Sequence, residues 1–143
     1  MRLPRPPQGD FNDWGNRLNA EIERNDARVL KSGQDVRLVN GERLFETFAH
    51  GITAHAGGGQ ASATALTARI NHIGTVASAA DSLLLMPAEA GLKQTVINKG
   101  ANAAQVFGTS PDTINGVATG TGVSQPAGTT TTYYCTQDGA WFS

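Results

Sequence analysis

Charge is distributed very unevenly along this chain. Of its 143 residues 23 carry a formal charge, and 16 of these lie before Thr47. The remaining sequence is rich in Gly, Ala and Thr and is interrupted by frequent turn-forming residues. This division predicts a charged N-terminal region, suited to attachment, that is joined to a nearly uncharged β-rich module.

The hydrophobic side chains of this sequence are mostly small. Twenty of them are alanines and 17 further residues are glycines, so one copy has little large apolar material with which to fill a core. Small domains also bury the smallest share of their surface. We therefore expect the protein to gain buried area by associating with identical copies, as a homotrimer.

The charge balance and the apolar runs exclude several classes of partner. A formal net charge of −1 gives no electrostatic footprint for nucleic acid or for an anionic membrane. The sequence has no apolar run of about 18 residues, and its first ten residues lack the apolar segment of a signal peptide. We expect no nucleic-acid partner and no membrane insertion. The single Cys135 cannot close an intrachain disulfide, and its position predicts a small, half-buried strand residue.

Residues 1–9 contain three prolines and two arginines. Proline fixes its own φ angle and biases the preceding residue toward extended geometry, so this segment predicts an extended arm without a helix. Such an arm either lies on a neighbouring protein surface or is a frayed terminus.

A helix is predicted over residues 10–33. Asp10 offers an N-cap, and Gly33 supplies a C-terminal stop. The apolar residues between them follow helical spacing and form one stripe, which also carries a polar residue able to fix register and oligomer number. We predict that this stripe is the oligomer interface; it comprises Phe11, Trp14, Leu18, Ile22, Asn25 and Val29.

Residues 34–59 predict a hairpin followed by a glycine-rich linker. Two strand-like runs, 35–39 and 42–46, flank Asn40-Gly41, which tolerates the positive φ angles of a type I′ turn. Residues 50–59 end in three consecutive glycines and predict a linker or a loop. We expect the attachment region and the module to be separable near Gly57, Gly58 and Gly59.

Residues 60–143 predict a small antiparallel sandwich or a jelly-roll-like module, so that the chain as a whole is mainly β. Short apolar runs alternate with turn-forming residues at the spacing typical of antiparallel sheets. The seven predicted strands cover residues 65–73, 82–86, 94–98, 104–107, 122–125, 130–135 and 140–142.

The sequence offers little catalytic, cofactor-binding or metal-binding chemistry. No two of its three histidines have the spacing of a metal pair on a helix, and the glycine run lacks the Gly-Lys-Ser/Thr ending of a phosphate loop. Most of the carboxylates after residue 60 lie in or beside predicted turns, where an Asp side chain can hydrogen-bond the nearby backbone. We predict no enzyme; the residues considered were His50, His55, His72, Asp81, Glu89, Asp112 and Asp138.

Several segments carry a resemblance to a known family. They are residues 52–60 (ITAHAGGGQ), 80–85 (ADSLLL), 90–92 (AGL), 96–103 (VINKGANA), 112–116 (DTING) and 135–143 (CTQDGAWFS). With these segments, residues 51–143 resemble a small β module of tailed-bacteriophage virion proteins, found on head fibres, decoration proteins and tail fibres. The resemblance implies a capsid or tail component that acts as an oligomer, with no cofactor and no catalytic residues.

These observations lead to a structural role as the expected function. Residues 1–46 would dock a homotrimer on capsid or tail proteins of the virion, after assembly in the cytoplasm of the host bacterium. The docking residues would include the arm, namely Leu3, Pro4, Arg5, Pro6 and Pro7.

The alternative function is a carbohydrate-binding module that recognises host-surface glycans through exposed aromatic rings. Its candidate residues are Tyr133, Tyr134 and Trp141. Because successive side chains of a strand point to opposite faces, only one ring of the Tyr133-Tyr134 pair is expected outside.

Overall fold

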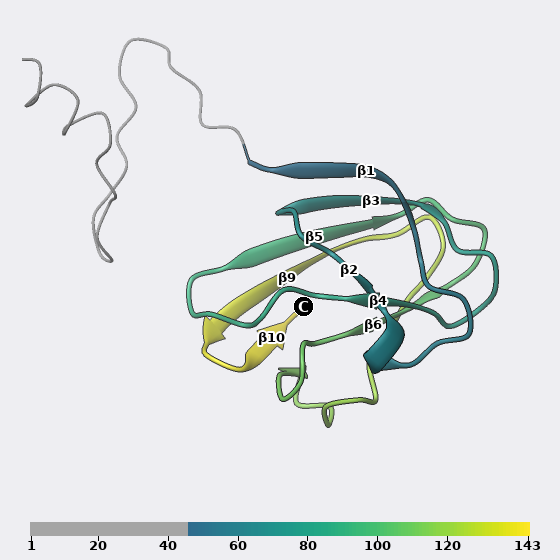
Figure 1. Ribbon diagram of the computed structural model, residues 1–143. Coiled ribbons are helices and arrows are strands. Elements are labelled where there is room, and N and C mark those ends of the chain that lie inside the picture. Colours follow the sequence, from purple (N-terminus) through teal and green to yellow (C-terminus); the bar gives the residue numbers. More distant parts are fainter. Residues whose placement is uncertain (1–45) are drawn as a thin grey trace, which may run out of the picture. The chain divides into compact units, whose positions relative to one another are not determined.

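A computed structural model describes residues 46–143, which form a module of two β-sheets (Figure 1). The mainly β character predicted for this part of the chain is confirmed, because its only helix is the short 3-10 helix η1 (Gln60–Ser62). The predicted arm over residues 1–9, the helix over 10–33 and the hairpin at Asn40-Gly41 lie outside the described residues.

The larger sheet has six strands in the order β1-β3-β5-β9-β10-β7, and the smaller has four in the order β2-β4-β6-β8. The larger sheet comprises β1 (Phe48–Thr53), β3 (Ile70–Thr75), β5 (Lys93–Asn98), β9 (Thr130–Gln137), β10 (Ala140–Phe142) and β7 (Thr113–Ile114). The smaller sheet comprises β2 (Thr64–Ala65), β4 (Asp81–Leu84), β6 (Ala104–Phe107) and β8 (Val123–Gln125).

The first six strands alternate between the two sheets, so the chain winds as a coil. Phe48 of β1 pairs with Ile70 of β3, and Ile70 pairs with Thr95 of β5, each time in parallel. Strands β2, β4 and β6 stack in parallel in the same way in the smaller sheet. One turn of this coil takes roughly 20 residues, a repeat length typical of solenoid proteins.

The predicted antiparallel arrangement is therefore wrong for β1 to β6. Among the described strands, antiparallel pairing joins β5 to β9, β9 to β10 and β6 to β8. The physical reason is that each connection between β1 and β6 crosses to the other sheet, so strands that follow one another in sequence are not neighbours in a sheet. Short apolar runs with turns between them do not distinguish this winding from a meander.

The module was predicted to begin at residue 60, after a linker over residues 50–59, but its first strand begins at Phe48. Residues 48–53 form β1, which pairs with β3 along the edge of the six-stranded sheet. The glycine run that follows has positive φ angles, which glycine adopts at little cost, and the Gly57 N–H donates to Asp81 Oδ1 at 3.3 Å. A fragment starting at Gln60 would therefore lack an edge strand of the sheet.

The run predicted as one strand over residues 65–73 is two strands separated by a corner. Gln94 of β5 holds this corner: its side-chain Nε2 donates to the carbonyls of Leu66 at 3.0 Å and Ala68 at 2.9 Å. Its Oε1 accepts the N–H of Met86 at 3.0 Å. The side chain is fully buried, and these three bonds satisfy its polar atoms.

The core between the sheets depends on a few large side chains. Trp141 and Tyr133 are the largest fully buried residues of the described part, and they pack with aliphatic residues such as Leu66, Ile73 and Leu83. Trp141 Nε1 donates to the Met86 carbonyl at 3.3 Å, and Tyr133 donates its hydroxyl to Gln125 Oε1 at 3.2 Å. Both rings thus keep their polar atoms bonded inside the module.

Candidate functional site

The candidate site is the side of the six-stranded sheet that faces away from the smaller sheet. Alternation along each strand sends one residue inward and the next outward. We call this side the outer face; it carries Phe48 and His50 of β1, Ile70 and His72 of β3, Lys93, Thr95 and Ile97 of β5, Thr132 and Tyr134 of β9, and Phe142 of β10. Their neighbours Asn71, Ile73, Gln94, Val96, Tyr133 and Trp141 are buried.

Exposed large hydrophobic side chains are concentrated on the outer face. Within residues 46–143 there are three, Phe48 (76% exposed), Tyr134 (53%) and Phe142 (40%), and all three belong to this face. Phe142 is the register partner of Tyr134, so these two rings occupy neighbouring strands. Tyr134 and Phe142 thus form one exposed apolar patch, and such patches mark interaction sites.

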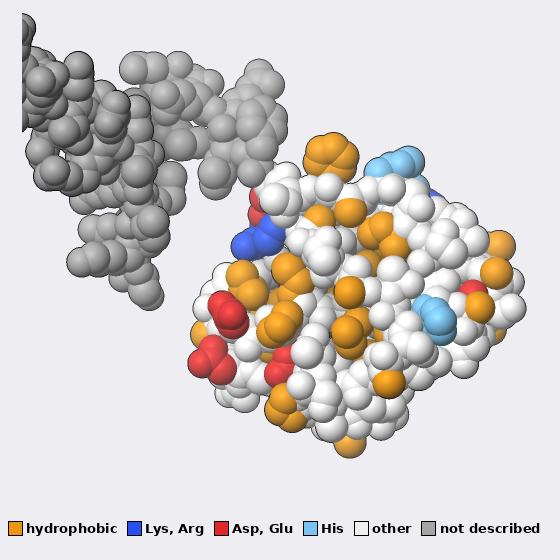
Figure 2. All heavy atoms as spheres, viewed as in Figure 1, with side chains coloured by type: hydrophobic (Ala, Val, Ile, Leu, Met, Phe, Trp, Pro, Cys, Tyr) orange, Lys and Arg blue, Asp and Glu red, His pale blue; other side chains and the backbone are white. Residues whose placement is uncertain are grey.

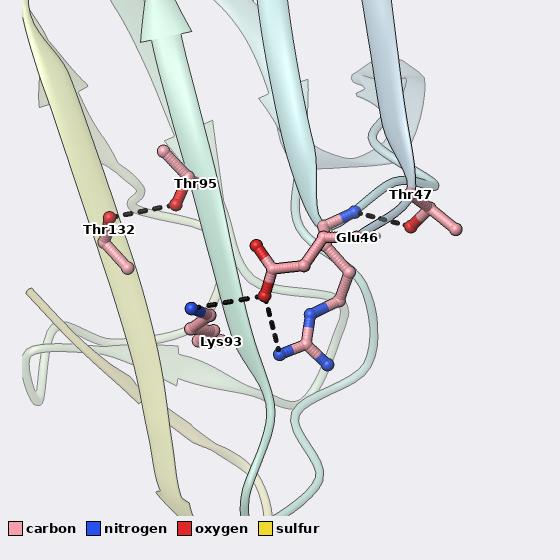
Figure 3. Close-up of polar contacts among 6 residues, drawn as sticks. Glu46, Thr47, Lys93, Thr95 and Thr132 are labelled. Carbon is pink, nitrogen blue, oxygen red and sulfur yellow. Dashed lines mark hydrogen bonds and ion pairs between the residues drawn. The ribbon is translucent and has the colours of Figure 1, made fainter. Parts of the chain in front are cut away.

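Charged residues at one end of the outer face form an ion-pair cluster. Glu46 accepts from Lys93 Nζ at 3.2 Å and lies 3.9 Å from an Arg69 guanidinium nitrogen (Figure 3). All three side chains are partly exposed, so the pairs contribute at most about 1 kcal/mol each to stability.

Hydroxyl groups near the middle of the face are also paired with each other. Thr95 Oγ1 and Thr132 Oγ1 lie 2.9 Å apart on neighbouring strands (Figure 3). The Thr47 hydroxyl accepts the backbone N–H of Arg69 at 3.1 Å. The polar groups drawn in this close-up therefore bond mainly with one another.

His50 and His72 stack on the outer face, with ring centroids 4.2 Å apart and ring planes 18° apart. They are adjacent because β1 and β3 run in parallel with Ala49 opposite Asn71. His55 is exposed, and its backbone bridges to Ser82. Across residues 46–143, no three His, Cys, Asp or Glu side chains come together as metal ligands would.

Two of the three predicted glycan-contacting rings are buried. Tyr133 is 1% exposed and Trp141 is fully enclosed, so the prediction that they present a binding surface is wrong. The expectation that only one of Tyr133 and Tyr134 lies outside is confirmed by the exposed Tyr134. Packing of the smaller sheet against the inner face explains the difference, because it covers Tyr133 and Cys135 of β9 and Trp141 of β10.

Sequence reasoning missed two residues of the outer face, Phe48 and Phe142. For Phe142 the signal was present, because it follows Trp141 directly and so takes the opposite face of the same strand. Phe48 carried no comparable signal, since the strand in which it lies was predicted as part of a loop region. The predicted oligomer stripe (Phe11, Trp14, Leu18, Ile22, Asn25, Val29) and docking arm (Leu3, Pro4, Arg5, Pro6, Pro7) lie outside the described residues.

Three carboxylates of the module accept hydrogen bonds from backbone amides, two of them from segments far away in sequence. Asp112 accepts the N–H of Ala88 at 2.7 Å, and Asp138 accepts that of Ala90 at 2.9 Å. Asp81 accepts the Ser78 N–H at 2.9 Å, and this bond holds the pKa of the Asp81 carboxyl below its ordinary value. Asp112 and Asp138 lie at turn positions predicted from sequence, whereas Asp81 begins β4.

The remaining reactive side chain, Cys135, points into the core. Burial raises the pKa of its thiol, and the sulfur donates to the Gln137 carbonyl at 3.0 Å. A protonated, enclosed thiol is a poor nucleophile. Cys135 is thus a packing residue, somewhat more buried than predicted.

The surface of the module carries few charges. On the side shown in Figure 2, most of the described surface is uncharged, and more of the charged side chains lie toward the left edge than toward the right. In the part of the chain that the structure describes, no helix has the length and apolar character needed to cross a membrane.

Compared with known proteins, the chain matches no family model, no curated protein and no solved structure. The functional conclusion therefore depends on the residues and contacts described above.

Proposed function

We propose that this protein is a non-enzymatic structural component of a tailed-phage virion. In this proposal the N-terminal region attaches to capsid or tail proteins, and the β module is displayed from the virion or seals part of its surface. The observation that carries the proposal is the outer face, where three large hydrophobic side chains are exposed on a two-sheet module. Such a surface is suited to assembly with other proteins.

The composition of the chain and the coil of strands support the same role. The resemblance of residues 51–143 to virion β modules covers β2 to β10 and the second half of β1. A coil in which each turn pairs with the next gains stability from neighbour-to-neighbour contacts and needs only a narrow core. This architecture accommodates the many alanines and glycines of the sequence.

We propose a homotrimer as the assembled form, located in the virion. The capsid and tail of a tailed phage both offer threefold positions, and closed symmetric assembly is the usual state of soluble oligomers. Identical copies would supply the apolar contacts that a single copy of this sequence lacks.

A glycan-binding module is the second candidate function, and the exposed pair of Tyr134 and Phe142 is the observation in its favour. Aromatic rings on a flat sheet surface can stack on sugar rings. The candidate loses support because two of its three predicted rings are buried and because Thr95 and Thr132 already bond each other.

Addition of the purified full chain to particles that lack it tests the proposal directly. We expect the protein to sediment with these particles at a fixed copy number, and a host glycan array to give no signal. Glycan binding without particle binding would replace the structural role with the second candidate. Native mass measurement of the same sample gives the oligomer number, for which three is expected.

A further inference from the structure

We propose that Asn115 is a site of spontaneous covalent modification, at which the side-chain amide is lost, and that two hydrogen bonds to Ser143 control the rate of this reaction. The proposal goes beyond the proposed function and does not depend on it. Three observations carry it: the Asn115-Gly116 dipeptide, the turn in which it lies, and the bonds that hold the Asn115 side chain.

The reaction needs only the chain itself and water. The backbone nitrogen of Gly116 attacks Asn115 Cγ and closes a five-membered succinimide ring, while the side-chain nitrogen leaves as ammonia with the Gly116 amide proton. Water then opens the ring at one of its two C–N bonds and leaves aspartate or isoaspartate. Asn115 is exposed, and among the described residues nothing lies within 4 Å of where a Cβ on Gly116 would stand. The attacking nitrogen is therefore not shielded by side chains.

The turn around this dipeptide blocks the attack while it is closed. The Val117 N–H donates to the Ile114 carbonyl at 2.9 Å, and the φ angles of Asn115 and Gly116 are 50° and 74°. Two positive φ angles are typical of a type I′ turn, whose first central residue has ψ near about 30°. At such an angle the Gly116 nitrogen and the Asn115 Cβ lie on opposite sides of the Cα–C bond, whereas ring closure needs them on the same side. The residue therefore reacts only when the turn opens.

The side chain of Asn115 is fixed as well. Its Nδ2 donates to Ser143 Oγ at 2.9 Å, and its Oδ1 accepts the Ser143 N–H at 2.9 Å. We call these two bonds the Asn115–Ser143 clasp. The clasp extends the pairing of β7 with β10, in which the Asn115 N–H donates to the Trp141 carbonyl at 2.8 Å. Because β7 has two residues and lies at the edge of its sheet, the clasp is a substantial part of its attachment. Short edge elements of this kind open at a lower free energy than the whole fold.

The two products have different consequences for the clasp. Aspartate keeps an oxygen that can accept both the N–H and the hydroxyl of Ser143, so the clasp can close again. Isoaspartate adds a methylene group to the backbone between Ile114 and Val117, so the type I′ turn cannot re-form. Isoaspartate at position 115 should therefore free β7 from β10, and ring opening makes this change one-way.

A proline at position 143 tests the control by the clasp in the full chain. Ser143→Pro removes both the N–H and the hydroxyl, and a proline is compatible with the strand conformation of the preceding Phe142. Ser143→Thr keeps both groups and is the matched control. Peptide mapping by mass spectrometry, after incubation in mildly alkaline buffer, should show Asn115 losing its amide roughly tenfold faster in Ser143→Pro than in the other two proteins, because two hydrogen bonds no longer hold it. Equal rates in all three folded proteins would overturn the control by Ser143.

Unfolding the wild type gives a readout that does not depend on a variant. In urea the turn and the clasp are absent, so Asn115 should react at least as fast as in Ser143→Pro and at a rate similar to that of Asn40, which also precedes a glycine. Asn115→Gln should give no product at this position on the same timescale, since a glutamine would need a six-membered ring. A slow reaction of Asn115 in urea would overturn the site, and equal rates in urea and in the folded wild type would overturn the protection.

Hydrogen exchange tests the consequence for the fold. In protein modified to isoaspartate, the Thr113 N–H, which donates to the Gly139 carbonyl at 3.0 Å, should exchange faster than in unmodified protein. The amide of Val96, a fully buried residue of β5, should exchange at an unchanged rate. Unchanged exchange at Thr113 would contradict the release of β7. These measurements use neither virus particles nor glycans, so their outcome is separate from that of the proposed function.

Discussion

The two faces of the six-stranded sheet are built from similar residues but have different surroundings. On the inner face, Tyr133 and Trp141 are enclosed, and each bonds its polar atom within the module. On the outer face, Tyr134 and Phe142 follow them directly in sequence and remain exposed. The comparison shows that an aromatic residue stabilises the fold when the second sheet covers it, whereas its sequence neighbour remains free to contact a partner.

The largest difference should come from truncating the neighbours Trp141 and Phe142. Trp141→Ala removes the largest buried side chain and leaves a cavity, so we expect unfolding free energy to fall by about 3–5 kcal/mol. Phe142→Ala should change the stability of the module by less than about 0.5 kcal/mol, apart from its effect on assembly. Urea unfolding at one protein concentration measures both; equal losses would remove the distinction between the faces.

The buried hydrogen bonds of Gln94 on the inner face can be compared with the exposed bond of Gln105 on the smaller sheet. Gln94→Ala leaves two carbonyls and one N–H without their partner, and we expect a loss of about 1–3 kcal/mol. Gln105, a partly exposed residue of β6, makes one bond to the Thr121 carbonyl at 2.8 Å, so Gln105→Ala should cost about 0.5 kcal/mol. If Gln105→Ala costs as much as Gln94→Ala, water reaches the corner that Gln94 holds.

The hydroxyls of Tyr133 and Tyr134 provide the most closely matched comparison. Burial raises the pKa of Tyr133, whose hydroxyl donates to the buried Gln125 Oε1. Tyr133→Phe should therefore cost about 1 kcal/mol, because the amide oxygen loses its donor. Tyr134→Phe should leave unfolding unchanged. A measurable cost for Tyr134→Phe would mean that this hydroxyl bonds a partner in the assembly.

The smallest effect, confined to acid, should come from Asp81, which belongs to neither face. The pKa of its carboxyl is depressed by the Ser78 N–H, so its contribution is fully present above the unfolded value of about 3.9. The contribution is lost as the pH falls through the lower, folded pKa. Urea midpoints between pH 7 and pH 2.5 should fall less steeply below pH 4 in Asp81→Asn than in the wild type. The exposed Glu89→Gln serves as control, and parallel curves for all three proteins would contradict the assignment.

Most strands of the module could be located from sequence, but their partners could not. Residues 104–107 and 140–142 were predicted with the bounds that the structure shows for β6 and β10, because turn-forming residues mark their ends. Strand β1 was missed since its residues, including His50 and Gly51, show no apolar alternation. Strand β7 was missed because two residues between turns give no period to detect.

The sequence by itself determined the β character of the module, the turn positions of Asp112 and Asp138, and the opposite orientations of Tyr133 and Tyr134. These features follow from one or a few neighbouring residues, through side-chain alternation and turn preferences. Only the tertiary structure decided that the strands wind as a parallel coil and that Phe48, Tyr134 and Phe142 share one exposed face. Pairing among β1 to β6 depends on contacts between residues roughly 20 or more positions apart, and no local pattern specifies which of several similar apolar runs will meet.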